Sequence, residues 1–210
     1  MPHAAIGFDR RIALGWLDAA ASLAAERRPA ADARRRLWSL LEGSVAGDTA
    51  HSARGKTITV LARVWITPPP MAAALHERAA EAFAIASPDQ RLGVHWAMLT
   101  AAYPFFADVA AHVGRLLALQ GEVQTAQLQR RIVTTWGDRS TIPRALQRTL
   151  RSMADWGALA DGSARGRFLP SGRMAPVSAE TRNLLKQGVV IAQESNGLGA
   201  ESGLFPFARH

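Results

Sequence analysis

The chain has 210 residues, of which 48% are hydrophobic and 20% are charged. This composition is ordinary for a soluble globular protein, and the length suffices for one substantial domain or two small ones. The formal net charge of +8 indicates a polyanionic partner, such as DNA, RNA or an anionic membrane surface. The absence of cysteine excludes disulfides, thiolate nucleophiles and cysteine-ligated zinc, and is compatible with a reducing cytosol.

No targeting or membrane-spanning segment is visible in the sequence. The N-terminus lacks the apolar stretch behind a basic start that a secretory signal has. The longest uncharged stretch, residues 92–107, contains Pro104 and is too short to span a bilayer. We therefore expect a soluble bacterial protein of the cytoplasm with no membrane partner.

The first part of the chain predicts six α-helices, because apolar side chains recur there at helical spacing. Residues 56–66 also contain enough β-branched side chains for a strand, and periodicity does not decide between the two, although we favour helix. The expected helices are residues 8–28, 32–43 with Asp32 as N-cap, 56–66, 71–86, 87–103 with Ser87 as N-cap, and 105–119.

The stretch from residue 125 to residue 173 predicts two helices joined by a tight turn and followed by a short β-hairpin. This order is the one that a winged helix-turn-helix uses. The second helix is expected to begin at Ser140 or Thr141 as N-cap and to end at Gly157. Residues 158–169 fit two short strands around a glycine-rich turn.

The second helix of this stretch has one apolar and one cationic stripe. At 100° per residue, Arg144, Arg148 and Arg151 fall within about 60° of one another, opposite the apolar side chains. Residues 130–173 contain nine arginines against three aspartates, which favours phosphate as the counterpart. The predicted nucleic-acid-binding residues are Arg139, Arg144, Arg148, Arg151, Arg165, Arg167 and Arg173.

These patterns predict a mainly all-α fold, a helical bundle body with a C-terminal winged helix-turn-helix-like element. The expected domains are the body in residues 1–121, the winged element in 122–175, and a short helix with a glycine-rich tail in 176–210 that packs on the body. We expect Ser178 to cap that short helix and residues 189–191 to form a small strand. All six tryptophans are interpreted as core residues, with Trp136 and Trp156 in a small core of the winged element.

The sequence contains no motif for catalysis, metal binding or nucleotide binding. His76 and Glu77 begin like a zincin pair, but Ala80 stands where the second histidine is required. The histidines do not fall at metal-ligand spacing, and no G-x-S-x-G, Walker A or dinucleotide-binding motif is present. We therefore expect a protein with no enzymatic activity, no cofactor and no metal.

Three features together resemble the BrxA family, small cytosolic accessory components of BREX phage-exclusion systems. They are the segment WAMLTAAYPFFADVAAHVGRLL at residues 96–117, the turn at residues 136–138 and the recognition-like helix over residues 141–159. The similarity covers residues 8–185. It implies an all-helical body similar to that of the antiterminator NusB, a winged C-terminal portion, double-stranded DNA binding and no enzymatic activity. No catalytic residue carries over, and the tail after Gln187 has no counterpart in the family.

Three functions remain open at this point. The first is a DNA-binding accessory or regulatory protein, with RNA as the alternative nucleic acid and other components of a defence complex as protein partners. The second is an adaptor whose winged module binds a protein or a second copy of the chain. The third, an enzyme, is the weakest, because no nucleophile, metal site or carboxylate pair is available to it. The oligomeric state and the target sequence stay undetermined.

Overall fold

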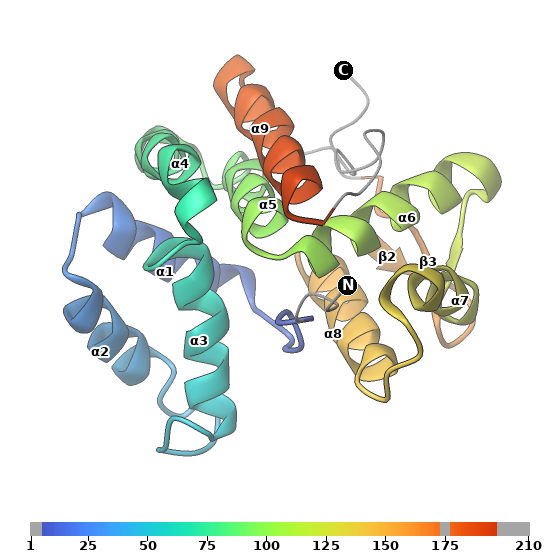
Figure 1. Ribbon diagram of the computed structural model, residues 1–210, viewed down its shortest axis with the longest axis horizontal. Helices are drawn as coiled ribbons and strands as arrows, with labels where there is room; N and C mark the ends of the chain where they lie inside the picture. The colour runs from blue at the N-terminus through green and yellow to red at the C-terminus, as the bar shows by residue number, and fades with distance from the viewer. Residues whose placement is uncertain (1–5, 173–176, 197–210) are drawn as a thin grey trace.

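The computed structural model describes residues 6–172 and 177–196, which are mainly helical (Figure 1). Arg173 and the glycine-rich tail from residue 197 onward therefore lie outside the described residues. The first half contains α1 (Leu14–Ala25), α2 (Ala30–Leu40), α3 (Ala53–Trp65), the 3-10 turn η1 (Pro70–Ala72), α4 (Ala73–Ile85), α5 (Arg91–Ala102) and α6 (Pro104–Gln120). The second half contains β1 (Val123–Gln124), α7 (Thr125–Trp136), α8 (Ile142–Asp155), β2 (Leu159–Asp161), β3 (Arg167–Pro170) and α9 (Ala179–Asn196).

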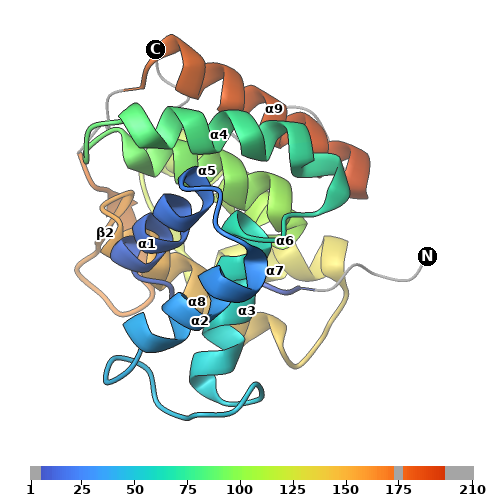
Figure 2. The same cartoon turned by 90° about the vertical axis from the view of Figure 1, so that its left-hand side faces the viewer.

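Helix α5 is the central element of the core. Its residues 92–102 are all buried, because α1, α3, α4, α6 and α9 pack around it. Figure 2 shows α9 lying along α4 and α5 on one side of the molecule. The approach of α9 to α5 is close, since a β-carbon at Gly188 would lie 2.5 Å from the carbonyl oxygen of Ala97. Glycine at position 188 therefore sets the distance between these two helices.

The segment before α1 is extended and passes between the body and α8. A helix was predicted from residue 8, but α1 begins only at Leu14. The backbone N–H of Ile12 donates to Ser152 Oγ (2.9 Å), and the carbonyl of Ile12 accepts from Trp156 Nε1 (2.8 Å). These bonds to α8 and its C-terminal end replace the ones that a helix would make. Phe8, fully buried, packs its ring against the rings of Tyr103, Phe106 and Trp156.

The predicted helix over residues 56–66 is confirmed as α3, which begins three residues earlier. Ser52 is its N-cap, and the Ser52 hydroxyl accepts from Gly55 N (3.2 Å). The hydroxyls of Thr57 and Thr59 donate to the carbonyls one turn before them (2.9 and 3.0 Å). These bonds let β-branched threonines sit in a helix without an unsatisfied hydroxyl.

Three further local predictions are wrong. Asp32 is not an N-cap, because α2 begins after Pro29 and the Asp32 carboxylate instead bonds Arg35 and Arg36. Ser87 is not an N-cap either, because its hydroxyl bonds Asp89 and α5 begins only at Arg91. The strand predicted at residues 189–191 is part of α9, which is 18 residues long. Packing against α5 overrides the β-branched composition there.

The predicted cap at Ser178 and the predicted hairpin are both confirmed. Thr181 N donates to Ser178 Oγ (3.0 Å), and β2 and β3 pair antiparallel with Ala160 opposite Leu169. The short strand β1, which the sequence did not reveal, pairs with the other edge of β3 to give the order β1-β3-β2. Two residues are too few to show an alternating pattern, so only the contact with β3 defines this strand.

Candidate nucleic-acid interface

Helix α8 has one buried, mainly apolar face and one solvent-facing polar face. Thr141 occupies the N-cap position, Pro143 lies in the first turn, and Gly157 after the helix has a left-handed φ of +76°. On the polar face Arg144 is exposed, while Arg148 and Arg151 are half-buried. The buried face consists of Ile142, Ala145, Leu146, Thr149, Leu150, Ser152 and Met153.

Arg151 is ion-paired to the sheet. Its two terminal nitrogens donate to the two carboxylate oxygens of Asp161 (2.9 and 2.6 Å), and its guanidinium lies 5.6 Å from the ring centroid of Phe168. The hydrogen bond from Arg151 lowers the pKa of Asp161 below its ordinary value. This arrangement attaches α8 to the β2-β3 hairpin.

Arg148 faces the segment before α1 instead of open solvent. Its Nη1 donates to the backbone carbonyl of Asp9 (2.5 Å). Burial, and then the neighbouring Arg10 guanidinium, lower the pKa of Arg148, with a smaller contribution from Arg144. Three guanidinium groups therefore gather where the N-terminal segment crosses α8.

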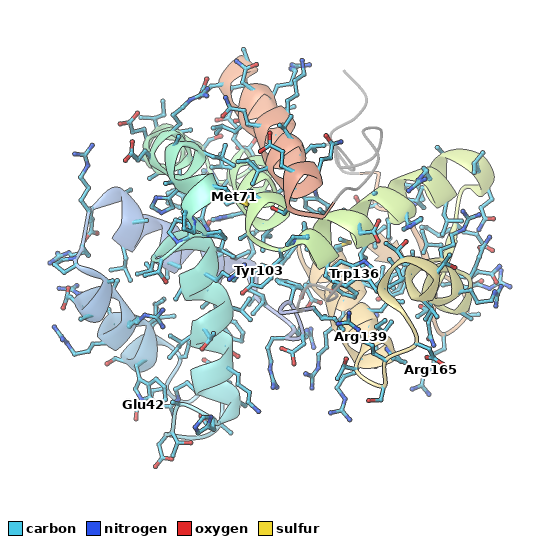
Figure 3. The ribbon with its side chains drawn as sticks, viewed as in Figure 1. Glu42, Met71, Tyr103, Trp136, Arg139 and Arg165 are labelled. Carbon is cyan, nitrogen blue, oxygen red and sulfur yellow. The ribbon has the colours of Figure 1, made fainter. Side chains whose placement is uncertain are left out.

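Arg144 and Arg165 are exposed, and neither makes a hydrogen bond or an ion pair with another residue that the structure describes. Arg165 lies in the turn between β2 and β3, and Arg139 lies in the turn between α7 and α8 (Figure 3). Arg167 differs from these residues, because its Nη1 donates to both carboxylate oxygens of Glu122 (3.1 Å each). The predicted site residues are thus spread over α8, its preceding turn and the hairpin.

The predicted burial of Trp136 and Trp156 is confirmed, but their neighbours belong to the helical body. Trp136 Nε1 donates to the Asp108 carboxylate of α6 (2.9 Å), and its ring packs edge-on against Phe105. The Trp156 ring lies about 6.1 Å from that of Trp96 on α5. These tryptophans therefore join the C-terminal elements to the body. Trp16 and Trp38, also predicted as core, are only partly buried against it.

The core contains a buried histidine network that the sequence does not reveal. His95 is fully buried; its Nε2 bonds Asp18 Oδ1 (2.8 Å), and its Nδ1 accepts from Trp65 Nε1 (3.1 Å). The partners stand 77 and 30 positions away along the chain, so no local spacing could reveal them. Both ring nitrogens are occupied and solvent does not reach them. His95 consequently has no ring nitrogen available to a substrate. We interpret His95, Asp18 and Trp65 as a structural network.

Comparisons of the chain with protein-family models, curated proteins and solved structures find no match. No single helix in the described residues is long and apolar enough to cross a membrane. Helices α3 and α4, with η1 between them, reach that length and composition only together, across a bend of 50°. Within residues 6–172 and 177–196 there is also no group of three or more histidine, aspartate or glutamate side chains that could hold a metal ion.

Proposed function

We propose that the chain is a non-enzymatic protein that binds double-stranded DNA, and that β1, α7, α8, β2 and β3 act as a winged helix-turn-helix. Two observations support the module. The element order places α8 directly after a short turn and before the hairpin, and the sheet order is β1-β3-β2. In this assignment α8 is the recognition helix, which lies in the major groove, and the β2-β3 turn is the wing.

The observation that carries the proposal is the exposure of Arg144 on α8 together with Arg165 in the β2-β3 turn. A duplex offers phosphates on both sides of the groove that a recognition helix occupies, so cations are needed on the helix and on its flanks. Arg151 lies on the same face of α8 as Arg144. Its pair with Asp161 is exposed, and exposed ion pairs contribute little free energy. Replacing Asp161 by a phosphate as the partner of Arg151 should therefore cost little free energy.

The test is duplex affinity as a function of salt concentration, measured by fluorescence anisotropy. Each phosphate contact contributes a log–log slope of about −0.9, so the double variant Arg144→Gln/Arg165→Gln should bind more weakly and flatten the slope by about 1.8. The control is Arg35→Gln/Arg36→Gln, which removes the same charge from two exposed positions on α2, although both of these arginines are paired with Asp32. If both double variants keep the wild-type affinity and slope, with unchanged circular dichroism, the proposal is wrong.

The protein-binding adaptor is the second candidate function. It is favoured by the pairing of Arg151 with Asp161 and of Arg167 with Glu122, because paired arginines leave fewer cations for phosphate. An adaptor should not bind duplex DNA with the salt dependence given above.

Competition between duplex DNA and duplex RNA of the same sequence distinguishes the two nucleic acids, since only RNA carries the 2′-hydroxyl. A role in phage defence, alongside protein partners in the cytoplasm, is proposed from the resemblance to BrxA alone.

A further inference from the structure

A groove lies between the body and the α7-α8 turn, and it is lined by the apolar Ile6 and Val60 as well as by polar side chains. Its volume is about 390 Å³, and its walls come from α3, from the turn before α8 and from the segment before α1. Figure 1 shows this N-terminal segment lying between α3 and α8. The polar lining consists of Asp9, Lys56, Thr59, Arg139 and Thr141.

Cations outnumber anions around this groove. Lys56 is exposed on one wall and Arg139 lines the other, whereas Asp9 is the one carboxylate among the lining residues that the structure describes. Asp9 is already engaged, since its Oδ1 lies 3.5 Å from Arg10 Nε. That nitrogen is buried and makes no hydrogen bond with a described residue.

The positive charge extends from the groove onto α8. Asp9 lines the groove, and its backbone carbonyl accepts from Arg148, which is within electrostatic range of Arg10 and Arg144. Thr141 adds a hydroxyl that makes no capping bond to α8. Its hydroxyl, on the same wall as Arg139, can donate to an anionic oxygen without losing a capping bond.

We infer that this groove binds a backbone phosphate of duplex DNA, with Lys56 and Arg139 as cationic ligands from opposite walls and Thr141 as a hydroxyl donor. The inference rests on the proposed function and makes it more specific. The helical body then contributes directly to the interface through α3. Duplex DNA that lies along α8 would reach the groove at the turn that precedes the helix.

The lysine content of the chain allows a direct test. Lys56 and Lys186 are the only lysines. Lys186 is exposed on α9, which has no residue in the groove. The acetylation rate of each lysine is measured by mass spectrometry on the full chain, without DNA, with duplex DNA and with inorganic phosphate alone. At a duplex concentration ten times Kd, acetylation of Lys56 should slow by about tenfold, since about one molecule in ten stays free. Acetylation of Lys186 should be unchanged.

A matched pair of variants gives a second readout. Lys56→Gln should flatten the salt dependence of duplex affinity by about 0.9, as expected for one lost phosphate contact. Lys186→Gln removes the same charge from α9 and should leave the slope unchanged. Both positions are exposed in helices, and glutamine has nearly the helix propensity of lysine, so neither change should unfold the protein.

Each result separates this inference from the proposed function. If wild-type protein binds duplex DNA but Lys56 stays fully reactive and Lys56→Gln keeps the slope, the groove assignment is wrong and the DNA-binding function stands. Protection of Lys56 by inorganic phosphate alone, without a change of slope in Lys56→Gln, would assign the groove to a free anion and also overturn the inference. No duplex binding by the wild-type chain would overturn both proposals.

Discussion

Arg151 of α8 and Asp161 at the end of β2 form an ion pair with two hydrogen bonds, of 2.9 and 2.6 Å. The pair connects the helix that we propose to enter the DNA groove with the strand that leads into the proposed wing. It also occupies one of the arginines that the sequence predicts to contact phosphate. Under the proposed function, Asp161 would compete with DNA for Arg151.

Replacing this carboxylate should strengthen DNA binding. In Asp161→Asn the Arg151 guanidinium loses its charged partner and one acidic group leaves the interface, so duplex affinity should rise. The salt dependence should become steeper by up to about 0.9 if Arg151 gains a phosphate. Asp155→Asn is the control: it removes the same charge near the end of α8 and releases Arg11, while Arg151 keeps its hydrogen bonds to Asp161 and loses only a weaker electrostatic partner. If the two variants change duplex affinity equally, the change in net charge alone explains the effect, and release of Arg151 does not.

The indole nitrogen of Trp136 should contribute to stability independently of its ring. Trp136→Phe keeps an aromatic ring against Phe105 but removes the donor to the buried Asp108 carboxylate. We expect the free energy of unfolding to fall by about 1–3 kcal/mol, the usual cost of an unsatisfied buried polar group. Trp38→Phe, at a half-buried position, should cost less. Urea denaturation measures both variants, and equal losses would contradict the role given to the Trp136–Asp108 bond.

His95 should make the protein less stable in mild acid. Burial lowers the pKa of His95, against an opposing effect of Asp18, while Arg91 also lowers it. Below the ordinary histidine pKa of about 6.5, the unfolded chain gains a proton that the folded chain takes up only at lower pH. The free energy of unfolding should thus fall between pH 6.5 and 5.0, by at most about 2 kcal/mol. In His95→Gln this part of the pH dependence should disappear. An identical pH profile in both proteins would rule out His95 as its source.

Two glycines should respond to alanine in opposite directions. A β-carbon at Gly188 would lie 2.5 Å from the Ala97 carbonyl oxygen, so Gly188→Ala should destabilise the fold by about 1–3 kcal/mol through overpacking. At Gly15, within α1, a β-carbon would meet no atom within 4 Å apart from its chain neighbours and the backbone of its own helix. Gly15→Ala should therefore stabilise the protein by about 0.5–1 kcal/mol through helix propensity. Thermal unfolding of both variants checks the sign, and destabilisation by both would contradict the distinction.

Arg27 should tolerate glycine with a gain in stability. It follows α1 with a left-handed φ of +53°, and the backbone N–H groups of Arg27 and Arg28 bond the last turn of the helix (2.8 and 3.1 Å). A left-handed backbone costs a residue that has a β-carbon about 1–2 kcal/mol. Glycine avoids this cost, but part of the gain is lost because glycine raises the entropy of the unfolded chain. Arg27→Gly should therefore raise the free energy of unfolding by roughly 0.5–1 kcal/mol. Glu26→Gly, at a right-handed position, should lower it.

Local sequence patterns determined most of the helices and the hairpin. The 3.6-residue spacing of apolar side chains is a property of each segment alone. For residues 56–66 that spacing does not exclude a strand, and the structure decides for the favoured helix, α3. The same reasoning identified the amphipathic character of α8, the cap at Ser178 and the burial of Trp136 and Trp156. All of these follow from interactions within about one turn of helix or from the orientation of a side chain on it.

Tertiary structure alone decided which of the predicted arginines are paired. Arg148 meets the carbonyl of Asp9, which stands 139 positions away, and Arg167 meets Glu122, 45 positions away. The conformation of residues 189–191 likewise depends on α5, and β1 exists only because β3 lies beside it. The groove between Lys56 and Arg139 is likewise formed only by the tertiary structure. Periodicity describes the faces of one element, whereas ion pairs and grooves depend on distances between elements, which the order of residues in a single chain does not specify.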